Sequence, residues 1–472
     1  MSGIDPARLE LCLSVIAELD NLPIDHPDAI KVRLATAQLY KTVKQRRRKE
    51  RRAAVTANDV TVTEATATGA PGRIDDETKG IALVSPTVGA SAGELLRPRS
   101  CYVCKDRYTT IDAFYHQLCP SCAKLNRERR DARCDLTGRR ALLTGGRAKI
   151  GMYIALRLLR DGADTTITTR FPGDALRRFS AMEDSADWLH RLRIVGLDLR
   201  DPAQVIALAD TVAARGPLDI LINNAAQTVR RSPGAYAHLV AGEAEPLPAG
   251  TAAEVTTFGH VSSGGGSGGV EPRRALTPHA LAALALVHGS ASPERIAAST
   301  AIDAGGLVPD LAPANSWSQR VHEIDALELL EVQLCNATAP FILVSRLRSA
   351  LAAAPARRKY VVNVSAMEGQ FSRGYKGAGH PHTNMAKAAL NMLTRTSARD
   401  LYADGILMTS VDTGWITDER PHPTKMRLAD TGFHAPLDLV DGAARVYDPI
   451  VRGIHGEPVS GVFLKDYRPV EW

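Results

Sequence analysis

The chain has 472 residues, a length that exceeds one ordinary domain and predicts two to three folded units. Hydrophobic residues make up 44% and charged residues 23%, the balance of a chain that buries a core. The net charge of +6 is too small for this length to indicate a polyanionic partner. No apolar run is long enough to cross a bilayer, and the first residues lack the pattern of a secretory signal. We therefore expect a cytoplasmic protein with no membrane partner.

Residues 1–52 predict a helical hairpin that runs into a basic segment. Asp5-Pro6 is a helix start, and Pro27 starts a second helix. Residues 41–52 hold eight lysines and arginines and one acid. Because the hairpin is too short to bury much surface alone, we expect it to dock on the main domain or on a second subunit of a homo-oligomer. Residues 53–95 have the Ala-, Thr-, Gly-, Ser- and Pro-rich composition of a linker.

Residues 96–132 carry two CxxC pairs that are separated by 14 residues. Each pair lets two thiolates bind one ion from a tight turn, and four sulfur ligands complete the tetrahedron that zinc prefers. The sequence therefore predicts a structural zinc site; a redox dithiol pair and a rubredoxin-type iron site are the alternatives. Basic residues flank the site, but zinc ribbons contact proteins as often as nucleic acid, so nucleic acid is not the expected partner. The predicted ligands are Cys101, Cys104, Cys119 and Cys122, with His116 and Cys134 as bystanders and Cys12 and Cys335 as core residues.

From residue 135 the pattern becomes strand, glycine turn, helix and strand, which predicts a parallel sheet. Three glycines (Gly145, Gly146 and Gly151) interrupt the first turn, where the backbone must approach a pyrophosphate that sits on a helix N-terminus. The pattern breaks at 230–314, which we interpret as a long, partly disordered insertion. We therefore predict an α/β fold with a doubly wound parallel Rossmann sheet over 135–472, preceded by a zinc-knuckle module and a small helical hairpin.

Seven elements, in order, resemble those of short-chain dehydrogenases. They are TGGRAKIG at the glycine turn, GLDL, LDILINNAA, LCNATAPF, YVVNVSA, MAKAALNMLTRTSA and VDTGWITDE. The resemblance implies catalytic roles for Ser365, Asn336 and Lys387. It implies cofactor contacts at Gly145, Arg147, Lys149, Ile150, Gly151, Asp198, Asn224, Lys387 and Thr413.

The end of the second strand predicts the choice of cofactor. Members of the family that prefer NAD place an acid there to bind the ribose hydroxyls. Here Thr169 is followed by Arg170, whose guanidinium is suited to bind a 2′-phosphate. NADP is the expected cofactor; NAD remains the alternative if Arg170 is only a solvated surface charge.

Two positions depart from the family pattern. Lys149 stands where the middle glycine of the turn is expected, and Thr383 stands four residues before Lys387, the place of the family's tyrosine. A threonine hydroxyl is too weak an acid to replace that phenol. Tyr375 is the first candidate for a substitute proton donor, followed by His380 and His382; the alternative is that these side chains only pack, contact substrate or cap the helix.

Together these features predict an NADP-dependent oxidoreductase that acts on a small carbonyl or alcohol substrate. The alternative is a non-catalytic NAD(P)-binding scaffold or sensor, whose zinc module and basic arm bind a partner.

Overall fold

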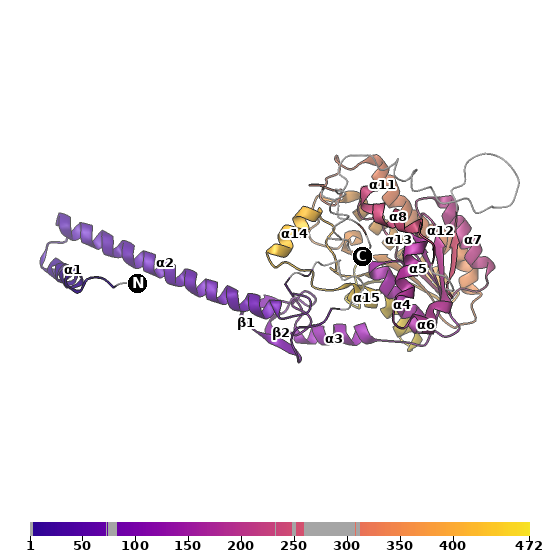
Figure 1. Cartoon of the computed structure of the whole chain (residues 1–472), viewed down its shortest axis with the longest axis horizontal. Helices are drawn as coiled ribbons and strands as arrows, with labels where there is room; N and C mark the ends of the chain where they lie inside the picture. The colour runs from indigo at the N-terminus through magenta and orange to yellow at the C-terminus, as the bar shows by residue number, and fades with distance from the viewer. Residues whose placement is uncertain are drawn as a thin grey trace.

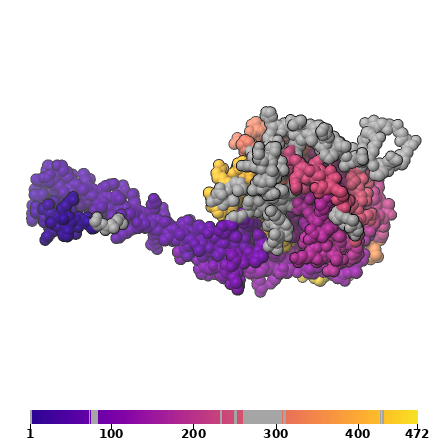
Figure 2. Space-filling model, in the orientation of Figure 1, coloured from indigo at the N-terminus to yellow at the C-terminus, as the bar shows by residue number. Residues whose placement is uncertain are grey.

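The computed structural model describes residues 3–71, 73, 83–231, 233–247, 252–258, 307 and 312–472. Figure 1 shows an α/β body, from which the N-terminal helices project as a long arm. The space-filling view in Figure 2 shows the same arm standing clear of the body.

A single sheet forms the centre of the body. Among the described residues its strands follow the order β11-β10-β9-β8-β6-β3-β4-β5-β7. Neighbouring strands pair in parallel, except for the antiparallel pair β10–β11. The order reverses at β3, which pairs with β4 on one side and with β6 on the other. The doubly wound fold is thus confirmed. The bounds are β3 Arg140–Leu143, β4 Asp164–Thr169, β5 Leu192–Gly196, β6 Ile220–Asn223, β7 Glu254–Thr257, β8 Lys359–Ser365, β9 Ile406–Asp412, β10 Phe463–Lys465 and β11 Arg468–Val470.

Helices cover both faces of this sheet, so its central strands are buried on both sides. Leu143 of β3 packs in one apolar core and its neighbour Leu142 in the other, since successive side chains point to opposite faces. The first face carries α4 (Lys149–Arg160), α5 (Pro172–Ser180), α6 (Ser185–Trp188) and α15 (Leu439–Ile454). The second carries α7 (Pro202–Ala214), α12 (Ala339–Ala352) and α13 (Pro381–Tyr402). Short 3-10 turns span Leu189–Arg191 and Met367–Gly369, and α14 spans His422–Asp430.

The helical stretch Ala326–Ala352 is long and apolar enough to cross a membrane by length and composition. It consists of α11 (Ala326–Gln333), a π-helical turn (Leu334–Thr338) and α12. α12 packs against α7 and buries Leu343 and Leu347 completely. We therefore interpret α12 as a core helix of the α/β body, whereas Leu327 and Leu330 of α11 are more than half exposed.

The predicted insertion contributes to the fold at its start. α8 spans Ala237–Glu243, and β7 adds a parallel edge strand to β5. Glu254 of β7 forms an ion pair with Arg193 of β5 at 2.9 Å. Residues 259–306 and 308–311, including the glycine-rich stretch, lie outside the described residues. The expected disorder therefore does not extend to β7, whose four residues were too few to give a recognisable alternating pattern.

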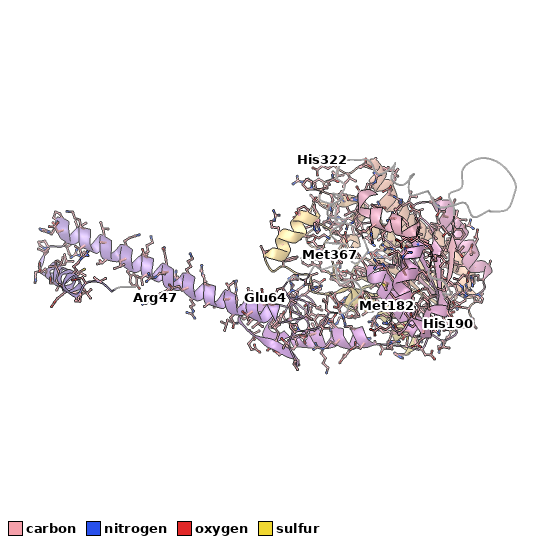
Figure 3. All side chains as sticks on the ribbon, in the orientation of Figure 1. Arg47, Glu64, Met182, His190, His322 and Met367 are labelled. Carbon is pink, nitrogen blue, oxygen red and sulfur yellow. The ribbon has the colours of Figure 1, made fainter. Side chains whose placement is uncertain are left out.

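The N-terminal arm is longer than predicted. α1 spans Pro6–Glu18, a 3-10 turn spans Leu19–Asn21 and α2 spans Pro27–Glu64, so the helix continues past the basic segment into the predicted linker. The absence of Gly and Pro from residues 53–64 permits this continuation, although half of these residues are Val or Thr. Figure 3 places Arg47 on the arm and Glu64 where the arm meets the body. α1 buries none of its side chains, and Cys12 is exposed rather than in a core. Docking of the arm on a second subunit stays a prediction.

The cysteine module is built from β1 (Ser91–Ser100), β2 (Arg107–Asp112) and α3 (Pro120–Asp131). β1 begins in the last residues of the predicted linker, and the end of α2 packs against it. Buried ion pairs join the module to the start of α15: Arg130 contacts Asp438 at 2.6 Å and Asp441 at 3.0 Å. The Tyr115 hydroxyl donates to Asp441 at 2.6 Å. The module is therefore fixed to the α/β body and does not hang from it on a linker.

Candidate functional site

The glycine turn between β3 and α4 is shaped for close approach of a ligand. Gly145 has a φ of +70°, and a Cβ on Gly151 would lie 1.9 Å from the carbonyl oxygen of Gly145. Side chains at these positions are therefore excluded. No side chain caps the N-terminus of α4, so its first N–H groups are available to an anion.

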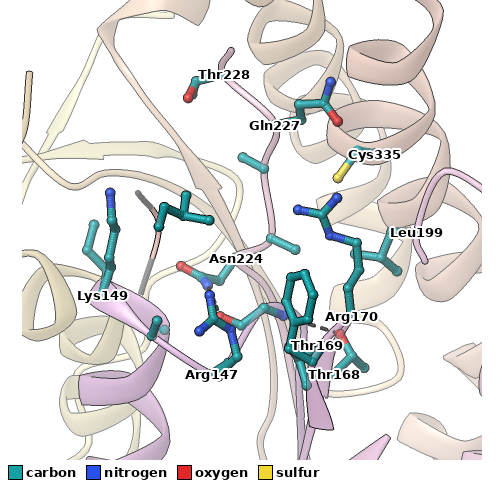
Figure 4. Close-up of a pocket in the computed structure, with 18 of the residues that line it drawn as sticks. Arg147, Lys149, Thr168, Thr169, Arg170, Leu199, Asn224, Gln227, Thr228 and Cys335 are labelled. Atoms are coloured by element: carbon teal, nitrogen blue, oxygen red, sulfur yellow. Dashed lines mark hydrogen bonds between the residues drawn. The ribbon is translucent and has the colours of Figure 1, made fainter. Parts of the chain in front are cut away.

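A pocket of about 380 Å³ opens at this turn, at the carboxyl ends of the strands. Figure 4 shows Arg147, Lys149, Arg170 and Asn224 around it. The Asn224 side chain donates to the carbonyl oxygens of Thr144 and Gly145, both at 3.1 Å, and so fixes the turn. The predicted cofactor residues that line the pocket are Gly145, Arg147, Lys149, Ile150, Gly151, Arg170, Asp198 and Asn224.

Lys149 occupies its unusual position at a cost in backbone energy. Its φ is +52°, in the left-handed region that glycine adopts freely and other residues avoid. The turn thus keeps the backbone shape of the family's glycine while it places an ammonium group at the pocket.

Basic side chains line the end of the pocket next to β4. The Arg170 guanidinium lies 4.7 Å from the centre of the Tyr236 ring and, among the described residues, has no carboxylate partner. The Asp198 carboxylate is different, since Arg200 binds it at 2.6 Å. Burial raises the pKa of Asp198, but Arg200 outweighs burial and holds it below its usual value. Among the described residues, Arg170 therefore differs from Arg147 and Arg200 of the same pocket, which form ion pairs with Asp174 and Asp198.

Ser365 and Lys387 lie together at the end of β8, and both of them and Asn336 are buried. Ser365 is 2% exposed, and its Oγ has no hydrogen-bond partner among the described residues. The Lys387 Nζ donates to the Val364 carbonyl oxygen at 2.8 Å, and burial lowers the pKa of Lys387 to about 8. Asn336 lies in the π-helical turn, and its side chain binds both backbone groups of Gln227. Ser365, Asn336 and Lys387 do not line the pocket.

Thr383, at the position of the family's tyrosine, is buried and bonded to the backbone. Thr383 is 1% exposed, and its Oγ1 donates to the Thr228 carbonyl oxygen at 3.4 Å. No acid stands there, as the sequence indicated.

The substitute donors are not gathered around Ser365. Tyr375 is 77% exposed, in a segment between β8 and α13 that has no regular structure. His380 stacks on Trp317 with ring centres 4.0 Å apart, which is a packing role. His382 is buried 3.9 Å from Glu328, and burial lowers its pKa.

Several pocket residues were not predicted. Cys335, interpreted from the sequence as a core residue, lines the pocket (Figure 4). Arg231 and Glu419 face each other at 3.5 Å, and Thr417 lies near them in the lining, whereas the predicted Thr413 does not line the pocket. Tyr236 and Arg231 fall at the start of the presumed insertion, where the family pattern gave no signal.

The four predicted ligand cysteines lie together, with their sulfur atoms within 4.8 Å of one another. The Cys104 and Cys119 sulfurs are 3.7 Å apart. A tetrahedral zinc ion with Zn–S bonds of about 2.3 Å places its sulfurs about 3.8 Å apart, so the donor set fits such an ion. His116 binds Thr68 and Cys134 lies against Tyr447, so neither joins the cluster.

Comparison with known proteins agrees with this architecture. A family model described as short chain dehydrogenase matches residues 139–239. The uncharacterized protein R665 of Acanthamoeba polyphaga mimivirus is 30% identical over 366 residues, which cover 75% of this chain and 71% of that protein. Residues 139–239, which include the glycine turn, are therefore similar to short-chain dehydrogenases.

Other matches are shorter or more distant. A probable oxidoreductase of Streptomyces lividans is 44% identical over 91 residues, which cover 19% of this chain and 29% of that protein. The chain thus matches less than a third of the length of this oxidoreductase. An NADPH-bound carbonyl reductase from chicken fatty liver has a TM-score of 0.44 and 18% identity, over 73% of this chain and 98% of that chain.

Proposed function

We propose that this chain is an NADP-dependent oxidoreductase that acts on a small carbonyl or alcohol substrate. The observation that carries the proposal is the pocket at the glycine turn, where the Arg170 guanidinium, at the end of β4, contacts Tyr236 but has no carboxylate in an ion pair among the described residues. A guanidinium at this position favours a 2′-phosphate over the two free hydroxyls of NAD. The N-terminus of α4 and the Lys149 ammonium group are suited to the pyrophosphate.

The groups at the end of β8 orient the substrate and donate the proton. NADPH, when bound, supplies a hydride for the substrate carbon. Ser365 orients the substrate oxygen, since its Oγ is otherwise without a partner. The proton for that oxygen comes from the Lys387 ammonium group, which burial makes acidic enough to donate near neutral pH. Tyr375 is the second possible donor, on an exposed segment that lies near in sequence.

A scaffold or sensor is the second candidate function. It is favoured by the enclosed position of Ser365, Lys387 and Asn336, together with the threonine in place of the tyrosine. Such a protein binds NADP without turning substrate over, and its basic arm and cysteine module bind a partner.

We propose zinc as the occupant of the cysteine cluster. The support is the set of four sulfurs within 4.8 Å of one another, which joins no histidine or carboxylate among the described residues. Four thiolates complete the tetrahedron of a closed, structural zinc site. Metal analysis of freshly purified, reduced protein should find about one zinc per chain. Protein that is free of metal under these conditions would remove zinc from the proposal.

Titration of the full chain with NADPH and NADH, followed by NADPH consumption with a panel of carbonyls, tests the proposed function. We expect tighter binding of NADPH and its oxidation by at least one carbonyl class. Binding without turnover across aldehydes and ketones favours the scaffold. Absence of binding to either nucleotide contradicts both candidates.

A further inference from the structure

The cysteine cluster lies next to a segment that forms part of the dinucleotide pocket. Tyr102 stands between Cys101 and Cys104, and its hydroxyl oxygen accepts a hydrogen bond from the Trp415 backbone N–H at 2.9 Å. Trp415 belongs to residues 413–419, which follow β9 and which we call the pocket loop. Thr417 and Glu419 of this loop line the pocket. One hydrogen bond thus joins the residue between two metal ligands to the loop that lines the pocket.

A shared apolar core makes the same connection. Three of the cysteines pack with Ile416 of the pocket loop and with Leu439 at the start of α15. Leu439 lines the pocket, and so does Ile150 of the glycine turn, which also packs against this core. Because protein cores are close-packed, a shift of the cysteines is transmitted to these lining side chains.

The pocket loop has little room to adjust. Gly414 has a φ of +79°, and a Cβ there would lie 2.6 Å from Leu437 and 3.5 Å from the Tyr102 hydroxyl oxygen. The buried Arg73, from the N-terminal part of the chain, donates to the carbonyl oxygens of Ala435 at 3.0 Å and Leu437 at 2.8 Å. Arg73 therefore fixes the segment between the pocket loop and α15.

We propose that the cysteine cluster, when it holds a metal ion, positions the pocket loop for dinucleotide binding through Tyr102. The ion fixes both ends of the short Cys101–Cys104 turn, and with them the Tyr102 ring. Without the ion the turn regains conformational freedom, which the hydrogen bond to Trp415 must then overcome. Tyr102 is a positioning residue, and the inference rests on the proposed function because it concerns the affinity of the same pocket.

The decisive variant is Tyr102→Phe in the full, metal-loaded chain. It removes the acceptor for the Trp415 N–H and leaves the cysteines intact. We expect the Kd for NADPH to rise about 3- to 10-fold, the usual worth of one hydrogen bond, with unchanged zinc content. Hydrogen exchange of the Trp415 amide should accelerate, and this second measurement needs no nucleotide.

The matched control is Tyr108→Phe. Tyr108 belongs to the same module, but its hydroxyl donates to the His116 carbonyl oxygen at 3.3 Å, inside the module. We expect this variant to keep both the NADPH affinity and the Trp415 exchange rate of the parent. Removal of metal from the parent chain by a chelator should also raise the Kd for NADPH. This measurement replaces the Tyr102→Phe comparison if that variant binds zinc poorly.

Three results would overturn the inference. They are unchanged NADPH affinity in Tyr102→Phe, unchanged affinity after metal removal, and equal effects of Tyr102→Phe and Tyr108→Phe. If the parent chain does not bind NADPH, the proposed function fails separately. In that case, hydrogen exchange of the Trp415 amide that is as slow in Tyr102→Phe as in the parent rejects the connection between the cluster and the loop.

Discussion

At the glycine turn, the backbone and Arg170 line an open pocket, whereas Thr383 and Lys387 of α13 are bonded to the protein's own backbone. Arg170 has no carboxylate partner among the described residues, and Gly145 and Gly151 keep the backbone clear for a ligand. By contrast, Thr383 and Lys387 donate hydrogen bonds to the carbonyl oxygens of Thr228 and Val364, respectively. Nucleotide binding and proton transfer are therefore separable in this chain, and variants can test each end alone.

The largest expected effect concerns the proton donor. Lys387→Met should lower carbonyl reduction by about 10²–10⁴-fold, the usual worth of general acid help. Tyr375→Phe and Thr383→Val should stay within a few-fold of the parent. The parent's rate of reduction should fall as pH rises through about 8, because the Lys387 ammonium group, whose pKa burial lowers to that value, then loses its proton. Initial rates from pH 6 to 10 measure this.

The same three variants also test the assignment of Lys387 as the proton donor. A loss of the same size in Tyr375→Phe, with a parent profile that is flat through pH 8, assigns the donor to the Tyr375 phenol instead. NADPH affinity must be measured beside every rate, since Lys387 is also an expected cofactor contact in this family.

Much of the binding end could be predicted because its signals are local. The glycines, the strand that precedes them and the charge of Arg170 lie within 30 residues of one another in the sequence, and the parallel sheet follows from the alternation of strands and helices. Cys101, Cys104, Cys119 and Cys122 were predictable for the same reason, since the spacing of metal ligands is itself a sequence pattern.

The parts that were missed depend on contacts between distant segments. Glu419 and Arg231 meet across the pocket although nearly the whole insertion separates them. Cys335 lies on an apolar helix, where a pocket-lining cysteine and a core cysteine give the same pattern. The contact between Tyr102 and Trp415 joins residues 313 positions apart, so no sequence pattern predicts it.

The next effect concerns nucleotide choice at the adenosine end. Arg170→Asp should weaken NADPH binding by about 1.5–3 kcal/mol, the worth of a hydrogen bond to a charged group, and should reverse the preference in favour of NADH. Arg395→Asp, an exposed arginine on α13, is the control for the change in net charge. Fluorescence titration with both nucleotides measures the effect. Equal preferences in the parent and in Arg170→Asp would remove Arg170 from the argument.

The smallest effect concerns the strained lysine of the glycine turn. Lys149→Gly relieves a left-handed conformation that costs about 1–2 kcal/mol, but glycine adds about 0.5–1 kcal/mol of unfolded-state entropy. The free energy of unfolding should therefore rise by between about 0 and 1.5 kcal/mol, while NADPH affinity falls because the ammonium group is lost. Lys149→Met is the matched variant, since it keeps the strain and removes the charge; it should lose affinity without gaining stability. Denaturant unfolding and NADPH titration of both variants separate the two contributions. If both variants bind NADPH as tightly as the parent, the ammonium group has no part in binding, and Lys149 is only a strained substitute for glycine.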